Sequence, residues 1–115
     1  MIDKQLEAGV RFRQGIATID LHGEINSFAE ETLLNAYQQA EANKPQNIVL
    51  NFSDVDYINS TGIALIVGLL ARARKAGLRL GVYGLSEHYV EIFNITRLSD
   101  FMNIYPDEDS LMAEL

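Results

Sequence analysis

Two short segments near the start of the chain alternate apolar and polar residues, as strands that bury one face do. They are residues 10–13 and 16–21, and Gln14 and Gly15 lie between them. A short turn with glycine between two alternating segments predicts a β-hairpin. Gly23 is expected to end the second strand of this hairpin.

Helix-like and strand-like patterns alternate along the rest of the chain. Apolar residues at helical spacing predict helices at residues 28–42, 61–75 and 86–94, and a last helix that starts at Pro106 or Asp107. Short apolar runs predict strands at residues 47–52, 78–83 and 102–105.

Two local details complete this assignment. Ser27 and Glu30 have the spacing of a capping box, so Ser27 is expected to cap the first helix. The polar residues 53–59 are expected to form a loop between a strand and the following helix.

The order of the predicted elements is β-β-α-β-α-β-α-β-α. Strands that alternate with helices pair in parallel, so the expected fold class is α/β. We expect a mixed, mainly parallel sheet with an N-terminal antiparallel hairpin and about four helices. A length of 115 residues fits a single domain over residues 1–115.

Composition and charge narrow the possible functions. Nine Lys and Arg oppose sixteen Asp and Glu, which gives a net charge of −7. An acidic surface repels phosphate backbones and anionic lipids, so direct nucleic-acid binding is not expected. The chain has no cysteine and only two histidines, so neither a thiolate nucleophile nor a thiolate or His-rich metal site is expected. Because the usual nucleotide-binding and catalytic motifs are missing as well, we expect no cofactor and no catalytic residue.

The chain shows no signal peptide, and its longest apolar stretch is too short for a membrane span. That stretch covers residues 63–71 and contains Gly68, whereas a bilayer requires about 20 apolar residues. We therefore expect a cytoplasmic protein without membrane insertion. Because 115 residues form a single core, we also expect a monomer when the protein is free.

The strongest candidate for a functional site lies where a predicted strand leads into an apolar helix. Asn59, Ser60 and Thr61 stand at this junction, and each could simply cap the helix. The same geometry has a functional interpretation, because a helix start favours an anion. A phosphate on a serine there would add about −1.5 to −2 charges without disturbing the fold.

The residues that follow this junction have two possible roles. Gly62 permits the close approach of a backbone, which either the fold or a partner could use. The apolar run from Ile63 to Leu70 covers more than one helical face. Most of it belongs to the core, and its first turns are expected to contribute to a docking surface.

Four sequence blocks together resemble the STAS domain, and more closely the small bacterial anti-sigma factor antagonists. The resemblance covers residues 10–115. The blocks are Leu-His-Gly-Glu-Ile-Asn at residues 21–26, Asn-Ile-Val-Leu-Asn-Phe at 47–52, Ile-Asn-Ser-Thr-Gly-Ile at 58–63 with Gly68 beyond it, and Leu-Arg-Leu at 78–80.

The resemblance implies a binding module that is not an enzyme. In this family, the unphosphorylated antagonist binds an anti-sigma factor that is also a serine kinase, and a sigma factor is released. The kinase phosphorylates the serine at the position of Ser60, and a serine phosphatase reverses this. The resemblance implies partner binding through Asn26, Asn59, Ser60, Thr61, Gly62 and Ile63, with Thr61 a weaker candidate acceptor.

The sequence departs from the family pattern at two positions. The family typically has Asp where this chain has Asn59 and Asn26. Both positions are expected to lie near Ser60, at one end of the sheet. The loss of two carboxylates either eases the accommodation of a phosphate or removes groups that orient the serine hydroxyl or contact the kinase.

Two alternatives remain beside the phosphorylation switch. The first is a STAS scaffold subunit that is never phosphorylated and belongs to a stress-signalling or transport assembly. The two Asn residues favour this alternative. The second is a small α/β enzyme or phosphoacceptor. This second alternative lacks a Gly-rich dinucleotide motif, a P-loop and a nucleophile elbow.

Overall fold

The computed structural model describes residues 4–115, which form a sheet with helices on both of its faces. The strands and helices are β1 (Glu7–Arg13), β2 (Ile16–Ile25), α1 (Glu30–Ala42), β3 (Asn47–Ile58), α2 (Ser60–Lys75), β4 (Arg79–Tyr83), α3 (Glu87–Ile95), β5 (Asn103–Tyr105) and α4 (Glu108–Glu114). Two short 3-10 turns, Ser27–Ala29 and Leu98–Asp100, precede α1 and β5. In the described residues, no helix has the length and apolar character needed to cross a membrane.

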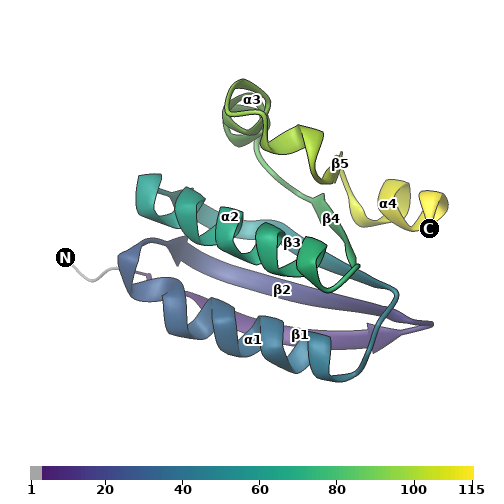
Figure 1. Cartoon of the computed structure of the whole chain (residues 1–115). Coiled ribbons are helices and arrows are strands. Elements are labelled where there is room, and N and C mark those ends of the chain that lie inside the picture. The colour runs from purple at the N-terminus through teal and green to yellow at the C-terminus, as the bar shows by residue number, and fades with distance from the viewer. Residues whose placement is uncertain (1–3) are drawn as a thin grey trace.

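The strands of the five-stranded sheet stand in their sequence order, β1-β2-β3-β4-β5. β1 and β2 pair antiparallel, and the other neighbours pair in parallel. The sequence prediction of a mixed sheet with an N-terminal hairpin is therefore confirmed. Each step from β2 to β5 moves in one direction, so right-handed crossovers place α1, α2 and α3 on the same face. Figure 1 shows α1 and α2 side by side over the strands.

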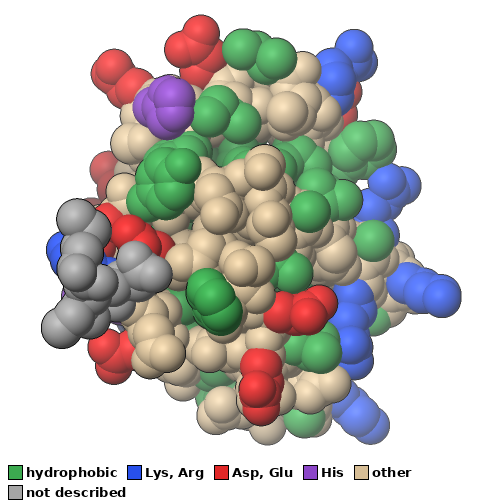
Figure 2. All heavy atoms as spheres, turned by 90° about the vertical axis from the view of Figure 1, so that its left-hand side faces the viewer, with side chains coloured by type: hydrophobic (Ala, Val, Ile, Leu, Met, Phe, Trp, Pro, Cys, Tyr) green, Lys and Arg blue, Asp and Glu red, His purple; other side chains and the backbone are tan. Residues whose placement is uncertain are grey.

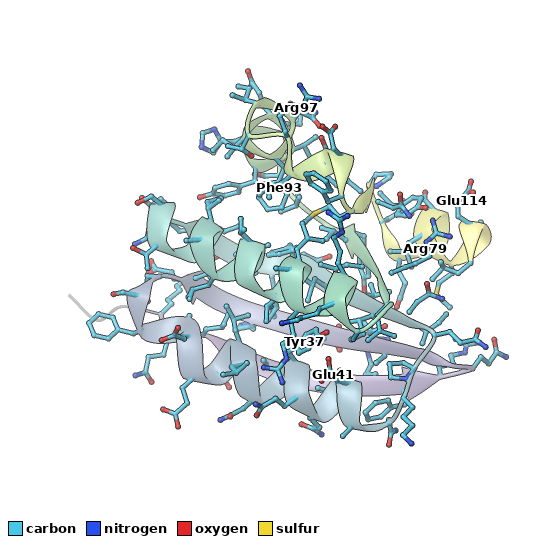
Figure 3. The ribbon with its side chains drawn as sticks, in the orientation of Figure 1. Tyr37, Glu41, Arg79, Phe93, Arg97 and Glu114 are labelled. Carbon is cyan, nitrogen blue, oxygen red and sulfur yellow. The ribbon has the colours of Figure 1, made fainter. Side chains whose placement is uncertain are left out.

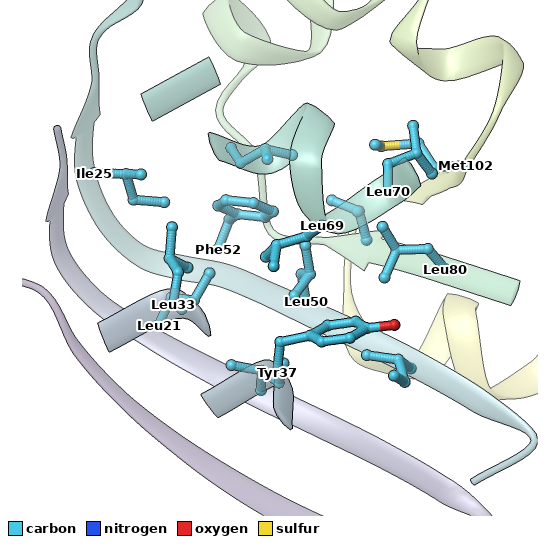
Figure 4. Close-up of a cluster of buried hydrophobic side chains, with 14 of the residues drawn as sticks. Leu21, Ile25, Leu33, Tyr37, Leu50, Phe52, Leu69, Leu70, Leu80 and Met102 are labelled. Atoms are coloured by element: carbon cyan, nitrogen blue, oxygen red, sulfur yellow. The ribbon is translucent and has the colours of Figure 1, made fainter. Parts of the chain in front are cut away.

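The alternation of side chains along β3 divides the interior into two clusters. Ile48, Leu50 and Phe52 belong to the large core beneath the crossover helices, part of which Figure 4 shows. Val49 points to the opposite face and packs with Leu111 of α4. β3 is thus covered on both faces over its first half, as its consecutive apolar residues predicted.

β2 and β3 extend further than the sequence predicted. β2 does not end at Gly23 but continues to Ile25, and the expected loop after Phe52 is strand up to Ile58. The two strands stay paired through shifts in register between Asp20 and Glu24. Gly23 has φ +112 and lies against the backbone of Gln5, so here glycine marks an irregularity within a strand and not its end.

The start of the first helix also differs from the prediction. Asn26, not Ser27, provides the cap: its side-chain oxygen accepts the backbone N–H of Phe28 at 2.9 Å. α1 begins only at Glu30, after the 3-10 turn. Phe28 was expected on the buried face, but it precedes the helix and its side chain is 80% exposed.

Candidate functional site

The two strands at the centre of the sheet end side by side, and each leads into a helical turn. Ile25 pairs with Ile58, so Asn26 and Asn59 follow at adjacent positions. The backbone N–H of Asn59 donates to the carbonyl oxygen of Ile25 at 3.2 Å, which ties the two junctions together. The structure therefore brings Asn26 and Asn59 to the same end of the sheet, as the sequence predicted.

Asn59 performs the capping at the start of α2. Its side-chain oxygen accepts the backbone N–H of Gly62 at 2.8 Å, and its backbone carbonyl accepts that of Ile63 at 2.9 Å. Because Asn59 provides the cap, the hydroxyl of Ser60 is not needed for it. Ser60 and Thr61 are both exposed in the first turn, where backbone N–H groups have no partner within a helix.

Gly62 is buried in the first turn of α2 and determines how closely this turn approaches the sheet. A Cβ atom on Gly62 would lie 2.8 Å from the carbonyl carbon of Ile25 and closer still to its oxygen. Only glycine lets the first turn of α2 approach β2 this closely. The sequence left open whether the fold or a partner uses the close approach at Gly62. The structure shows that the backbone of this chain uses it.

A tyrosine from α3 supports the same junction, and sequence reasoning missed it. The Tyr89 hydroxyl accepts the backbone N–H of Ile58 at 2.8 Å in a buried position. Ile58 is the last residue of β3 and lies two residues before Ser60. Nothing in the local sequence of α3 indicates this contact, because it joins residues 31 positions apart.

Exposed apolar side chains surround the start of α2. Phe28 is 80% exposed, Tyr57 is 52% exposed and Val67 is 41% exposed. Ile63 is half-buried and packs against the core, in which Ile66 and Leu69 of α2 are buried. Figure 2 faces this end of the molecule and shows apolar and uncharged surface in the middle, with most charged side chains toward the rim.

A shallow groove between α1 and α2 continues this apolar surface. It is lined by Leu34, Ala64, Leu65 and Gly68, with charged Glu30 and Arg72 at its borders. Of the apolar run from Ile63 to Leu70, only Ile66, Leu69 and Leu70 are buried, so less of it is core than the sequence predicted. Figure 1 shows the two helices that form its walls.

The relative position of α1 and α2 is fixed at the far end of this groove. The Arg72 guanidinium lies 5.5 Å from the centre of the Tyr37 ring and 3.7 Å from the Glu41 carboxylate. Burial raises the pKa of the Tyr37 hydroxyl above its ordinary value, and neighbouring Glu41 raises it further. Tyr37 is therefore neutral, and its side chain is fully buried, as its inward position in Figure 3 shows.

The predicted site residues themselves carry no ionisable side chain. Asn26, Asn59, Ser60, Thr61 and Ile63 are all uncharged. Acidic residues lie nearby, among them Glu24 and Asp56 on the ends of β2 and β3. Among residues 4–115, no group of three or more acidic or histidine side chains could hold a metal ion. The groups that the site offers to a ligand or partner are a hydroxyl and backbone amides.

The fold thus combines a mixed five-stranded sheet with an exposed serine in the first turn after its third strand. A family model described as "STAS domain" matches residues 7–111, and the chain belongs to this family. An "Anti-sigma-B factor antagonist" of Listeria monocytogenes is 28% identical over 82 residues, which is 71% of this chain and 72% of that protein.

Solved structures share the fold at lower sequence identity. An anti-sigma factor antagonist from Mycobacterium paratuberculosis superposes with a TM-score of 0.81 at 19% identity, covering 96% of this chain and 93% of that chain. The Bacillus cell fate determinant SpoIIAA in its phosphorylated form superposes with a TM-score of 0.70 at 18% identity, covering 94% of this chain and 99% of that chain.

Proposed function

We propose that this chain is an anti-sigma factor antagonist switched by phosphorylation of Ser60. With Ser60 unmodified, it binds an anti-sigma factor with serine kinase activity in the cytoplasm, and a sigma factor is freed. The kinase then phosphorylates Ser60 and the complex dissociates, and a serine phosphatase resets the switch. The names of its curated relatives and the phosphorylated form of SpoIIAA support this proposal.

The single observation that carries the proposal is the separation of capping from Ser60. Because Asn59 caps α2 at 2.8 Å, the Ser60 hydroxyl can be modified without loss of the cap. The first-turn amides and the positive end of the α2 dipole favour a phosphate at this position. A phosphoserine would be tolerated by the fold and would still place about two negative charges on the surface.

The surface around Ser60 supports docking of a protein partner. Phe28, in the turn after β2, and Val67, two turns after Ser60 on α2, expose large apolar side chains, and Ile63 in the first turn is half-buried. A partner that covers this surface would desolvate Ser60 at its centre. A phosphate there would lose its hydration without gaining a paired cation, so binding would weaken.

The two Asn residues tune this switch without altering its architecture. Asp caps helices as well as Asn does, so the replacement changes charge and not capping. With Asn26 and Asn59, the end of the sheet that carries Ser60 has two neutral amides where a chain with Asp would have two carboxylates. We therefore expect the phosphorylated form to be stabilised relative to a chain with Asp at both positions.

The first test is the intact mass of the protein isolated from its own cells, with and without stress, followed by mapping of the modified residue. Phosphate on Ser60 whose occupancy changes with conditions supports the switch. Phosphate mapped to another residue would refute the assignment of Ser60. A chain that is unmodified under all conditions would favour the alternative of a STAS scaffold subunit in a signalling or transport assembly.

The second test measures binding to the partner that co-purifies with the native chain. Ser60→Asp is expected to weaken binding at least tenfold, and Ser60→Ala is expected to bind normally and resist phosphorylation. Gln39→Glu is the control, because Gln39 is exposed on α1 outside the surface around Ser60 and the change adds the same charge. Equal weakening by the two acidic variants would show a general charge effect and count against a surface centred on Ser60.

A further inference from the structure

A second groove lies on the opposite edge of the sheet from β1, between α3 and β5. A hollow of about 490 Å³ is bordered by Leu85, Val90, Ile104 and Pro106, together with other residues of the same segments. A neighbouring hollow of about 470 Å³ shares Val90 and Ile104 with it, so the two form one continuous groove. We call this the α3–β5 groove, and it contains none of the residues around Ser60.

One wall of the α3–β5 groove is an unpaired strand edge. β5 is the last strand of the sheet and pairs only with β4, through Asn103, Ile104 and Tyr105. The other side of β5 has no neighbouring strand within residues 4–115. Such an edge exposes main-chain donors and acceptors that can pair with an added strand, while an adjacent groove takes alternate side chains.

The charged side chains around the α3–β5 groove are acidic and indicate which kind of segment can bind there. Glu87 and Glu91 border it from α3, and both are exposed. Asp107 and Asp109 lie at the start of α4, immediately after β5. The two hollows are lined by no Lys or Arg from residues 4–115. A second copy of the chain would bring the same carboxylates to the edge, so self-pairing through β5 is opposed by repulsion.

We infer that the α3–β5 groove binds an extended segment of a partner protein in which apolar residues alternate with Lys or Arg. The main chain of this segment pairs with the outer edge of β5. Its apolar side chains enter the groove against Val90 and Ile104, and its basic side chains point to the other face of the sheet, toward the carboxylates at the start of α4. The carboxylates of α3 add to the negative charge along the groove. This goes beyond the proposed switch, because it provides a second contact surface formed by other elements.

The test uses synthetic eight-residue peptides with blocked ends, titrated into the full chain labelled with ¹⁵N. A peptide of alternating Val and Lys is expected to shift the amide signals of residues 87–94 and 103–105. A peptide of alternating Val and Glu should bind at least tenfold more weakly. The Val-Lys peptide with every second amide methylated should also bind at least tenfold more weakly, because it cannot form the strand ladder.

A charge-reversal pair separates this groove from general attraction to an acidic protein. Glu91→Lys should weaken binding of the Val-Lys peptide at least fivefold, while Glu31→Lys on α1 makes the same charge change away from the groove and should leave binding unchanged. Equal effects of the two variants, or equal binding of the Val-Glu or methylated peptides, would overturn the inference. So would the absence of any shift at millimolar peptide.

Discussion

Two asparagines determine how the residues around Ser60 behave. Asn26 and Asn59 each follow the last residue of a strand. The side chain of each accepts a backbone N–H of the turn that comes next, at 2.9 and 2.8 Å. Capping by the residue before Ser60 is what leaves the serine hydroxyl at the surface. Asn59 therefore stabilises the start of α2, while the neighbouring Ser60 carries the proposed regulation.

Replacing Asn59 tests its role as a cap. Asn59→Ala removes the acceptor for the Gly62 N–H and should lower the free energy of unfolding by about 1 kcal/mol. Asn59→Asp keeps the acceptor and places a negative charge at the start of the helix, so it should be neutral or slightly stabilising. Urea unfolding of both variants checks this, and equal losses for Ala and Asp would contradict the capping role.

The two glycines of α2 are expected to respond in opposite ways to alanine. Gly62→Ala forces a methyl group into the backbone of Ile25 and should cost about 2 kcal/mol or more. Gly68→Ala meets nothing within 4 Å and should stabilise the chain by about 0.5–1 kcal/mol, since alanine favours the helix. Thermal or urea unfolding of the pair is the measurement, and a destabilised Gly68→Ala would contradict the open space at that position.

At the scale of elements, the sequence predicted the order and type of every strand and helix, because apolar spacing is set by which faces are buried. It did not predict where β2 and β3 end. Asp54 and Asp56 are polar and rare in strands, which favoured a loop. Asp54 nevertheless pairs with His22 of β2, and Asp56 lies within β3 at a shift in register. Pairing between distant segments outweighs such local preference.

Only those features of the candidate site that depend on local sequence could be predicted, and those that depend on distant segments could not. The position of Ser60 at the start of a helix follows from local sequence, and so does a cap at the same junction. The choice of Asn26 over Ser27 does not, because both residue types cap well. Tyr89 and exposed Phe28 could not be found, since their roles depend on the packing of α3 and on the 3-10 turn before α1.

The link from α3 to β3 is tested by Tyr89→Phe. The variant keeps the ring and removes the hydroxyl, which leaves the buried N–H of Ile58 without its acceptor. We expect a loss of about 1–3 kcal/mol in the free energy of unfolding. Hydrogen exchange should accelerate at the Ile58 amide more than at Leu50 in the middle of β3. Unchanged exchange at Ile58 would show that the bond contributes little.

At the scale of the molecule, a polar cluster on the face of the sheet beneath α4 connects distant parts of the chain. The Arg11 guanidinium on β1 donates to both carboxylate oxygens of Asp20 at 2.6 and 2.9 Å, and to the carboxylate of Glu108 on α4 at 3.1 Å. It also donates to the Tyr83 hydroxyl at 3.3 Å, and Asn51 donates to Asp20 at 2.7 Å. One side chain thus joins the first strand to the last helix.

This cluster predicts a defined dependence of stability on pH. Partial burial raises the pKa of Asp20, but hydrogen bonds from Arg11 and Asn51 outweigh it, so the pKa lies below its ordinary value. A carboxyl group with a lowered pKa stabilises the fold above its unfolded pKa of about 3.9, and this contribution is lost as the pH falls through the folded value. The stabilisation by Asp20 is therefore present at neutral pH.

The measurement compares Asp20→Asn with the unmodified chain by urea unfolding at pH 7 and at about pH 3. The variant should be less stable at pH 7, and the difference should shrink at the lower pH as Asp20 becomes protonated. Glu91→Gln, which removes an exposed carboxylate outside the cluster, is the control and should show a smaller change between the two conditions. A difference that is constant with pH would show that Asp20 acts through packing and not through its charge.

The order of the strands has a consequence for how the molecule is made. Since β1 to β5 stand in the sheet as they stand in the sequence, each strand leaves the ribosome next to a partner that is already present. The sheet can grow by one strand at a time, without any strand inserting between two earlier ones. The contact between Arg11 and Glu108 spans 97 positions and closes only after β5 has been added. This contact therefore forms only after the whole sheet is assembled.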